Sequence, residues 1–417
     1  MKMKRLIATS LLLAGLQGSA CLAQVPGSEV PREAGIETVR PQLGIPLKAA
    51  QAYLEQNKPA LALKKLSETD AIADLTDWEK YSRARIGASA AALSGDDEVL
   101  IKALLVILSA PYLSAQERTP FEQALVAVYF RAKQYTRLID YMSTDIQAGK
   151  DPELRGLLAF AYFQVGDFKN ASVVQANLLH SPEGAEKAAA AENWTQLASS
   201  CLRAGDRQCY LEALEKIAAL QYSGTVMREA LHIIAANSNY ANRIQVEAYR
   251  LRQKIVPLNA VELLDFSRLL LMDGAPAEAT VLVETAFKNG SLGKGADAPR
   301  HERLKALVAN EYARSISQPE SVLNSYKHGG YFDKIVELGY DMVHTGQVGK
   351  GIELIEFAIA SAKLNDPAVA KLHLGLAYAA AGRYDESAVQ LNSIPGDDGL
   401  AQLGRLWVIQ NKQSMKR

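Results

Sequence analysis

Aromatic residues, cysteines and long apolar runs are all scarce in this chain of 417 residues. Phe, Trp and Tyr make up 7% of the sequence, and there are three cysteines. After the N-terminus, no stretch approaches the ~18 consecutive apolar residues that a membrane-spanning helix requires, so we expect no such helix. No window shows sustained alternation of apolar and polar residues, which argues against a β-sheet.

An excess of positive charge is also missing. The chain has 46 Lys and Arg residues against 46 Asp and Glu residues. The first 23 residues contain Lys2, Lys4 and Arg5 and no acidic residue, so the remainder has 43 bases, 46 acids and a net charge of −3. Binding to nucleic acid requires a concentrated basic face. We therefore expect no nucleic-acid partner.

Residue patterns that support catalysis or metal binding do not occur either. The six histidines are scattered, and none has the spacing of an H-E-x-x-H motif. No G-x-S-x-G motif occurs. The loop from Gly290 to Gly295 resembles a phosphate loop, but Lys294 is followed by glycine and the loop follows a helix instead of a strand. We expect no enzymatic activity, no metal and no cofactor.

The N-terminus has the features of an export signal. The basic residues at its start are followed by an apolar run from Leu6 to Leu16 and by the small-residue stretch from Gly18 to Ala23. This order is typical of a secretory signal peptide, so we predict cleavage near Ala23 and a periplasmic protein. The alternative is cleavage before Cys21 with lipidation of that cysteine, which would give an outer-membrane lipoprotein.

The rest of the chain divides into a short leader and a long helical region. Residues 24–46 contain four prolines and few apolar residues, which predicts a flexible leader. From Pro46 onward, helical patterns continue almost without interruption. We therefore expect an all-α protein.

One helix–turn–helix pattern recurs along the helical region. Its most regular copy runs from Val369 to Leu391, with a turn at Gly382, and a second strong copy runs from Gly156 to Leu178. A unit of this size cannot bury its apolar stripe alone, so neighbouring units must stack on one another. Six turn positions mark the copies: Lys133, Gly166, Gly205, Gly274, Gly346 and Gly382. Their spacing indicates a unit of about 34–36 residues, with two degenerate units hidden in the longer intervals.

On these residues the chain resembles the tetratricopeptide repeat (TPR) family, whose pattern is W-x2-L-G-x2-Y, then A-x3-F, then A and P. The matching positions in three copies are Leu158, Ala159, Tyr162, Gly166, Phe168, Ala171 and Leu178; Trp194, Leu197, Ala198, Gly205 and Leu214; and Leu374, Gly375, Tyr378, Gly382, Tyr384 and Leu391. Departures from the pattern, such as Cys201 in place of tyrosine, imply local shifts of helix packing.

The resemblance implies a right-handed superhelical solenoid of antiparallel helix pairs, with about ten hairpins. The predicted organisation is a signal peptide at 1–23, a leader at 24–46, a repeat solenoid at 47–395 and a C-terminal capping helix and tail at 396–417. A plain helical bundle is the alternative architecture. A terminal cap is expected because an open stack must cover its last apolar face.

The repeat pattern also predicts where Cys201 and Cys209 lie relative to each other. It puts Cys201 late in one helix and Cys209 early in its partner, across the turn at Gly205. Positions of this kind approach to a Cα separation of about 5–6 Å, which suits a disulfide. We predict that bond in an oxidising compartment. The alternative is that Cys201 is a small buried apolar residue and Cys209 is incidental.

A protein-binding groove is the function that the resemblance implies. In this family, the first helices of successive units line the concave face and contact peptide or protein partners. Aromatic and Arg side chains there would supply most of the binding energy. The inward positions expected from the matched copies are Phe130, Phe160, Phe163, Thr195, Ser199, Leu264, Arg268, Val336, Tyr340, Leu372 and Leu376.

These features predict a non-catalytic periplasmic scaffold or adaptor of the cell envelope that binds a protein or peptide partner. The C-terminal third, up to the stretch from Leu400 to Trp407, is similar to periplasmic repeat proteins that accompany TonB-type energy-transduction systems. Two alternatives remain open: a lipid-anchored assembly or export factor of the outer membrane, and a subunit of an envelope enzyme.

Overall fold

A computed structural model describes residues 38–144, 152–236, 242–315, 319–396 and 399–416. Within them the secondary structure is helical, with 22 α-helices, one short 3-10 helix and no strand. The chain forms two compact units, residues 1–188 and 189–417. The predicted signal peptide, with Ala23 and Cys21, lies outside the described residues. No helix in the described part of the chain is both long and apolar enough to cross a bilayer.

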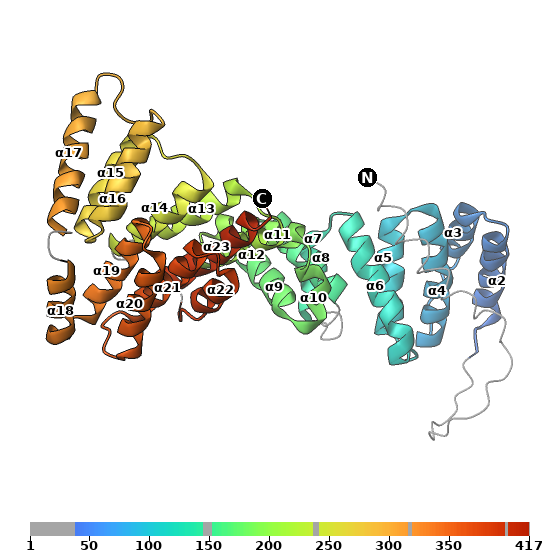
Figure 1. Cartoon of the computed structure of the whole chain (residues 1–417). Coiled ribbons are helices and arrows are strands. Elements are labelled where there is room, and N and C mark those ends of the chain that lie inside the picture. Colours follow the sequence, from blue (N-terminus) through green and yellow to red (C-terminus); the bar gives the residue numbers. More distant parts are fainter. Residues whose placement is uncertain (1–37, 145–151, 237–241, 316–318, 397–398, 417) are drawn as a thin grey trace. The chain divides into compact units, whose positions relative to one another are not determined.

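The first unit contains nine α-helices in consecutive order (Figure 1), and each packs against its neighbours in sequence. Their bounds are α2 (Pro41–Glu55), α3 (Pro59–Ser67), α4 (Asp77–Ser94), α5 (Asp97–Ser109), α6 (Ala115–Arg131), α7 (Tyr135–Thr144), α8 (Pro152–Gln164), α9 (Phe168–His180) and α10 (Ala185–Ala188), with the 3-10 helix η2 (Pro182–Gly184) before α10.

The first helix begins within the predicted leader. Helix α2 starts at Pro41, where a missing N–H costs nothing, and it continues through Pro46. Leu43, Leu47 and Ala50 form its buried stripe against α3 and α4. Burial of this stripe outweighs the local preference of Pro46 for a helix start. The prediction that the leader extends to residue 46 was therefore wrong, because a helix already begins at Pro41.

The second unit contains the remaining helices, α11 to α23. Their bounds are α11 (Ala191–Ala204), α12 (Arg207–Leu220), α13 (Gly224–Ala235), α14 (Asn242–Ile255), α15 (Ala260–Met272), α16 (Pro276–Lys288), α17 (Ala298–Ser315), α18 (Pro319–Gly329), α19 (Phe332–His344), α20 (Val348–Ala360), α21 (Pro367–Ala380), α22 (Tyr384–Asn392) and α23 (Leu400–Ser414). The all-α class and the consecutive pairing of helices are confirmed.

Glycine allows the closest helix pairs of this unit to form. A Cβ atom added at Gly375 in α21 would lie 2.7 Å from the Leu391 side chain of α22. In α19 and α20, a Cβ at Gly351 would lie 2.4 Å from the carbonyl oxygen of Gly339. These contacts explain why the repeat pattern has glycine or another small residue where the paired helices touch.

One predicted pair does not form. The degenerate unit expected between Gly274 and Gly346 would pair residues 301–315 with residues 320–327, which correspond to α17 and α18. Helix α17 instead packs on α16 and α15, where Leu304 and Val308 join a core cluster centred on Phe266. Helix α18 packs on α19. Helices α15 and α16 offer the apolar stripe of α17 a larger apolar surface than the short helix α18 does.

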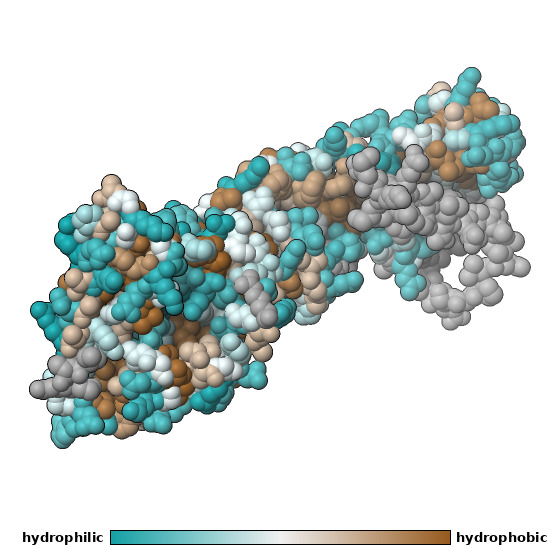
Figure 2. All heavy atoms as spheres, turned by 45° about the horizontal axis from the view of Figure 1, so that its top comes forward, coloured by the Kyte–Doolittle hydropathy of each residue, from teal (hydrophilic) through white to brown (hydrophobic). Residues whose placement is uncertain are grey.

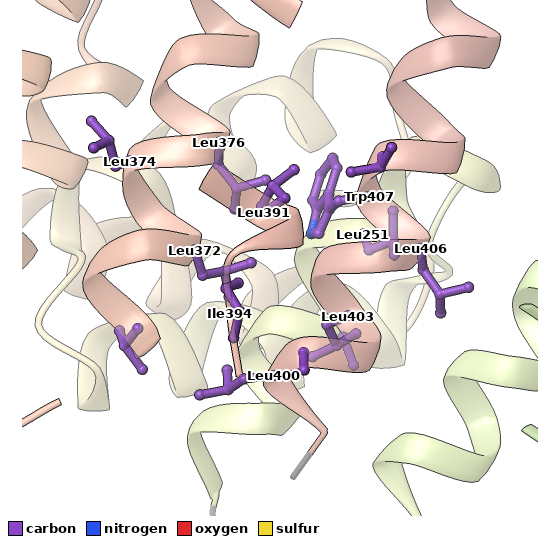
Figure 3. Close-up of a cluster of buried hydrophobic side chains, with 14 of the residues drawn as sticks. Leu251, Leu372, Leu374, Leu376, Leu391, Ile394, Leu400, Leu403, Leu406 and Trp407 are labelled. Atoms are coloured by element: carbon purple, nitrogen blue, oxygen red, sulfur yellow. The ribbon is translucent and has the colours of Figure 1, made fainter. Parts of the chain in front are cut away.

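The last helix returns to the start of the second unit. Helix α23 packs on α21 and α22, but it also contacts α12, α13 and α14. Figure 3 shows Leu403, Leu406 and Trp407 of α23 close to Leu251 of α14. Polar contacts support this return: Tyr222 donates a hydrogen bond to Gln410 at 2.7 Å, and Arg405 pairs with Glu215 at 2.7 Å. Helix α23 therefore joins two ends of one core, in addition to covering α22 as predicted.

Candidate functional site

Two of the predicted groove residues meet in an aromatic cluster of the first unit. Phe130 at the end of α6 and Phe160 in α8 have ring centroids 5.2 Å apart, and Tyr135 at the start of α7 lies 6.0 Å from Phe130 and 6.1 Å from Phe160. Phe160 is 38% exposed, and the other two rings are partly buried. Offset and edge contacts of this kind hold the rings in fixed orientations. We call these three residues the aromatic surface.

The remaining predicted residues on accessible positions are spread along the chain. Phe163 is partly buried and packs edge-on against Phe168 at 5.2 Å, across the α8–α9 turn. Arg268 is exposed on α15 in the second unit. Thr195 is exposed and Ser199 is partly buried, both on α11. Each of these residues keeps a surface position, and none of them belongs to the aromatic surface.

Five residues of the predicted groove are core residues, which corrects their assignment. Tyr340 is 6% exposed, Leu372 is 0% exposed and Leu376 is 6% exposed. Leu264 and Val336 are buried as well. Helices α14, α22 and α23 share a core cluster with α19 and α21. A partner could reach Tyr340, Leu372 or Leu376 only if that core opened.

Tyr340 belongs instead to a buried ionic cluster that sequence reasoning missed. At its centre lies Arg250 of α14, which is 2% exposed. Its guanidinium donates to Glu247 of the same helix, and to Glu278 of α16 at 2.7 Å from Nη2 and 3.0 Å from Nε. Asp273 lies 3.6 Å away. Bidentate contacts to carboxylates are the strongest hydrogen bonds that a guanidinium makes.

Two rings complete the cluster. The imidazole of His373 in α21 lies 2.9 Å from Glu247 and 3.3 Å from Arg250 through its Nε2 atom. The ring of Tyr340 stacks on His373 with centroids 4.2 Å apart, and Arg250 lies 4.8 Å from the Tyr340 centroid. A cation over an aromatic face is favourable, more so where water is excluded. Residues from α14, α16, α19 and α21 thus meet at one buried point.

A carboxylate of α19 caps the N-terminus of α16 next to this cluster. The first turn of α16 has no side-chain cap of its own. Asp341 accepts hydrogen bonds from the backbone N–H groups of Glu278 at 3.1 Å and Ala277 at 3.3 Å. It therefore acts as a non-local cap, and its charge also suits the positive end of the helix dipole. His344 lies 3.6 Å from Glu278 on the same side.

The pKa shifts follow from burial and charge. Burial would raise the pKa of Glu247, but the charge of Arg250 and contacts with His373 lower it to about 2. Burial raises the pKa of Asp341 to about 6, although its two backbone hydrogen bonds oppose this shift. Burial also lowers the pKa of His344 and raises that of Tyr340 well above its usual value. Carboxylates outnumber cations here, so not all the carboxylates ionise equally well.

This arrangement is suited to holding helices together. Arg250 is buried together with its partners Glu247, Glu278 and His373. Among the described residues, no three or more His, Cys, Asp and Glu side chains could jointly hold a metal ion. Removal of one charged side chain of the cluster would leave its partners as unpaired charges in an apolar core. A signal existed in the sequence: Glu247, Arg250 and His373 are polar residues on otherwise apolar helix faces. Their partners could not be identified, because they come from helices distant in sequence.

A surface cleft between α13 and α14 is the second feature that sequence reasoning missed. It has a volume of about 470 Å³ and lies within the second unit. Exposed polar side chains of both helices line it above an apolar floor. These two helices form the degenerate unit expected between Gly205 and Gly274, and nothing in their pattern indicated a cleft.

The predicted disulfide is present. Cys201 at the end of α11 and Cys209 in the first turn of α12 are bonded, with their Cα atoms 5.7 Å apart. Asp206 caps α12 by accepting a hydrogen bond from the Cys209 N–H at 3.0 Å. The cap fixes the turn between the helices, and the short turn brings the two sulfurs together. Cys201 is also fully buried.

The exposed apolar residues form no single continuous patch on the face shown in Figure 2. Hydrophobic groups there are separated by hydrophilic ones. The exposed large apolar side chains include Leu105, Phe160, Val165, Val173 and Leu202. Scattered residues of this kind are normal on a protein surface. The aromatic surface differs from them because its three rings touch one another.

No protein-family model and no curated protein matches the sequence. Solved structures with similar helical arrangements include Naa15/Naa10 bound to HypK-THB, with 12% identity, a TM-score of 0.31 and coverage of 86% of this chain and 64% of that one. The TPR domain of P58(IPK) has 15% identity, a TM-score of 0.21 and coverage of 90% and 99%. Yeast Tom70 has 11% identity, a TM-score of 0.18 and coverage of 90% and 96%. This chain thus spans about two thirds of the first of these structures. At such TM-scores, the likeness transfers neither partner nor activity.

Proposed function

We propose that this protein is a non-catalytic scaffold of the bacterial cell envelope that binds a protein partner through its aromatic surface. The N-terminal signal features support export, with cleavage near Ala23. The helix pairs support a binding role because they offer long side-by-side helical surfaces. An association with a TonB-type complex is the finer form of this proposal.

The contact between Phe130 and Phe160 carries the proposal. These rings come from α6 and α8, the first helices of two successive pairs, and their centroids lie 5.2 Å apart. Phe160 keeps 38% of its surface exposed. A pre-ordered aromatic group loses little entropy on binding, and such groups dominate the energy of protein interfaces.

Site-specific crosslinking in the living cell tests this surface. A photoreactive phenylalanine analogue is placed at Phe160 and, as a matched control, at Val173 on α9, which is exposed in the same unit. We expect a discrete crosslinked product from position 160 and none from position 173. The captured partner is then purified and titrated with the wild-type protein and with Phe160→Ala. Loss of the ring should weaken binding about tenfold or more.

Two results would contradict the proposal. Equal crosslinking at positions 160 and 173 would mean that the first position is not a specific contact. An unchanged affinity of Phe160→Ala for the purified partner would remove the aromatic surface from the interface. Export is tested separately by fractionation, and acyl labelling at Cys21 distinguishes a lipoprotein from a periplasmic protein.

A further inference from the structure

We propose that the cleft between α13 and α14 binds a small organic anion that carries a planar ring. This site is separate from the aromatic surface and does not depend on the scaffold function. Its volume of about 470 Å³ falls within the range of small-molecule sites. The two helices follow one another in the chain and pack together (Figure 1).

Two guanidinium groups lie in the walls of the cleft. Arg228 and His232 of α13 and Arg252 of α14 line it, and Glu229 is the one carboxylate among its lining residues. A guanidinium binds the oxygens of a carboxylate or phosphate through parallel hydrogen bonds. The guanidinium of Arg228 therefore suits an anionic group of a ligand.

Arg228 is the residue most available to the ligand. It is exposed, and its guanidinium makes only long hydrogen bonds, 3.4 Å to the carbonyl oxygen of Gly224 and 3.5 Å to the hydroxyl of Thr225. Arg252 differs because Glu262 of α15 pairs with it. We therefore assign the anionic group of the ligand to Arg228, with the pair of Arg252 and Glu262 as one wall of the site.

Tyr249 provides a surface for a planar ring. It lines the cleft from α14 and is held by stacking on Phe266 of α15, with centroids 5.2 Å apart and the ring planes 16° apart. Leu231 and Ala248 are buried residues of the lining and form an apolar floor. An apolar floor, a fixed ring and a few polar groups are the usual elements of a ligand site.

Calorimetric titration of the full chain tests the assignment with three probes: phenyl phosphate, inorganic phosphate and phenol. Phenyl phosphate contains both required groups, and each of the other probes contains one. We expect saturable binding of phenyl phosphate, at least about tenfold tighter than binding of inorganic phosphate or of phenol. Arg228→Gln should weaken the binding of phenyl phosphate about tenfold or more, since it removes a charge-assisted contact.

Arg303→Gln is the matched control, because it removes the same charge from an exposed position on α17 of the same unit. It should leave the affinity unchanged. The proposal is overturned if phenyl phosphate does not bind saturably, or if Arg228→Gln and Arg303→Gln weaken binding equally. It is also overturned if inorganic phosphate or phenol binds as tightly as phenyl phosphate. Crosslinking at Phe160 is independent of each of these outcomes.

Discussion

The two units of this protein hold their helices together in different ways. In the first unit, helices pack on neighbours in sequence, and the arginines of charged pairs reach solvent. The arginines of Arg40–Glu79 and Arg118–Glu122 are 44% and 38% exposed, although the partner carboxylates are buried. In the second unit, α23 returns to α12–α14, and Arg250 is 2% exposed among buried partners. Nearest-neighbour packing makes stability local, whereas long-range packing makes it collective.

This difference determines which first-helix residues stay accessible in each unit. A locally stabilised stack can keep an aromatic group such as Phe160 at its surface, since no distant helix covers it. A unit closed on itself buries the corresponding first-helix residues, such as Tyr340 and Leu372. Four experiments test the comparison, from the largest expected effect to the smallest.

Removing the central cation should have the largest effect. Arg250→Met leaves Glu247 and Glu278 buried without their partner, which we expect to lower the free energy of unfolding of the second unit by about 3–5 kcal/mol. Urea denaturation followed by circular dichroism measures it. Arg314→Met is the control, because Arg314 is 76% exposed in its pair with Glu311, and exposed pairs contribute about 0–1 kcal/mol. A loss below about 1 kcal/mol for Arg250→Met would refute the central role of this cation.

Matched leucine truncations separate local from collective packing. Leu403 in α23 and Leu138 in α7 are both fully buried, so each Leu→Ala change should cost about 2–5 kcal/mol. Hydrogen exchange should differ between the two. We expect Leu403→Ala to speed exchange in α12–α14 as well as in α21 and α22, and Leu138→Ala to act only on α6–α8. Exchange confined to α22 and α23 in Leu403→Ala would contradict the closed core.

A substitution pair tests close packing in the repeat. Gly375→Ala places a Cβ 2.7 Å from Leu391, and we expect a net loss of about 1–2 kcal/mol after the helix propensity of alanine is counted. Gly349→Ala in α20 meets no atom within 4 Å and should leave stability unchanged or raise it by up to about 1 kcal/mol. Thermal unfolding of both variants checks the signs, and a gain for Gly375→Ala would contradict the close contact.

The pH dependence should show the smallest effect. The pKa of Asp341 is raised to about 6, so the folded state binds its proton before the unfolded state does. The contribution of this residue to stability therefore increases as pH falls, by about 1 kcal/mol between pH ~7 and pH ~5.5. Glu247, whose pKa is lowered to about 2, contributes stability above pH ~4.5 that is lost as pH falls toward 2.

Comparison with Asp341→Asn isolates the first contribution. The amide oxygen of the asparagine can still accept hydrogen bonds from the first turn of α16, but it does not titrate. Thermal unfolding between pH 7 and pH 4.5 should show a smaller gain for this variant than for the wild type. Equal pH profiles would show that Asp341 does not titrate in this window.

Local features of the fold were predictable from the sequence. The helix pairs followed from apolar spacing and turn residues, and the Cys201–Cys209 bond followed from a short turn between antiparallel helices. The start of α2 was not predicted, because Pro46 normally ends or begins a helix, yet burial of Leu47 keeps it inside one. The pairing of α17 failed for a related reason, since α16 offered its stripe a larger apolar surface than α18 did.

The candidate site was predictable only in part. The repeat register placed Phe130 and Phe160 on first helices, and in the structure they touch. The same register placed Tyr340, Leu372 and Leu376 on a groove, and in the structure they are core residues. Register specifies which face of a helix points toward its neighbours in sequence. It carries no information about helices that return from far along the chain.

The sequence by itself determined the helices, their pairing into repeats and the disulfide, because these depend on spacing over fewer than about 40 residues. Only the tertiary structure decided that α23 closes the second unit, that Arg250 joins four helices and that α13 and α14 leave a cleft. The closure by α23 and the junction at Arg250 depend on contacts between residues over 100 positions apart, such as His373 with Glu247. Such contacts arise from the sum of packing over the whole unit, which no local pattern encodes.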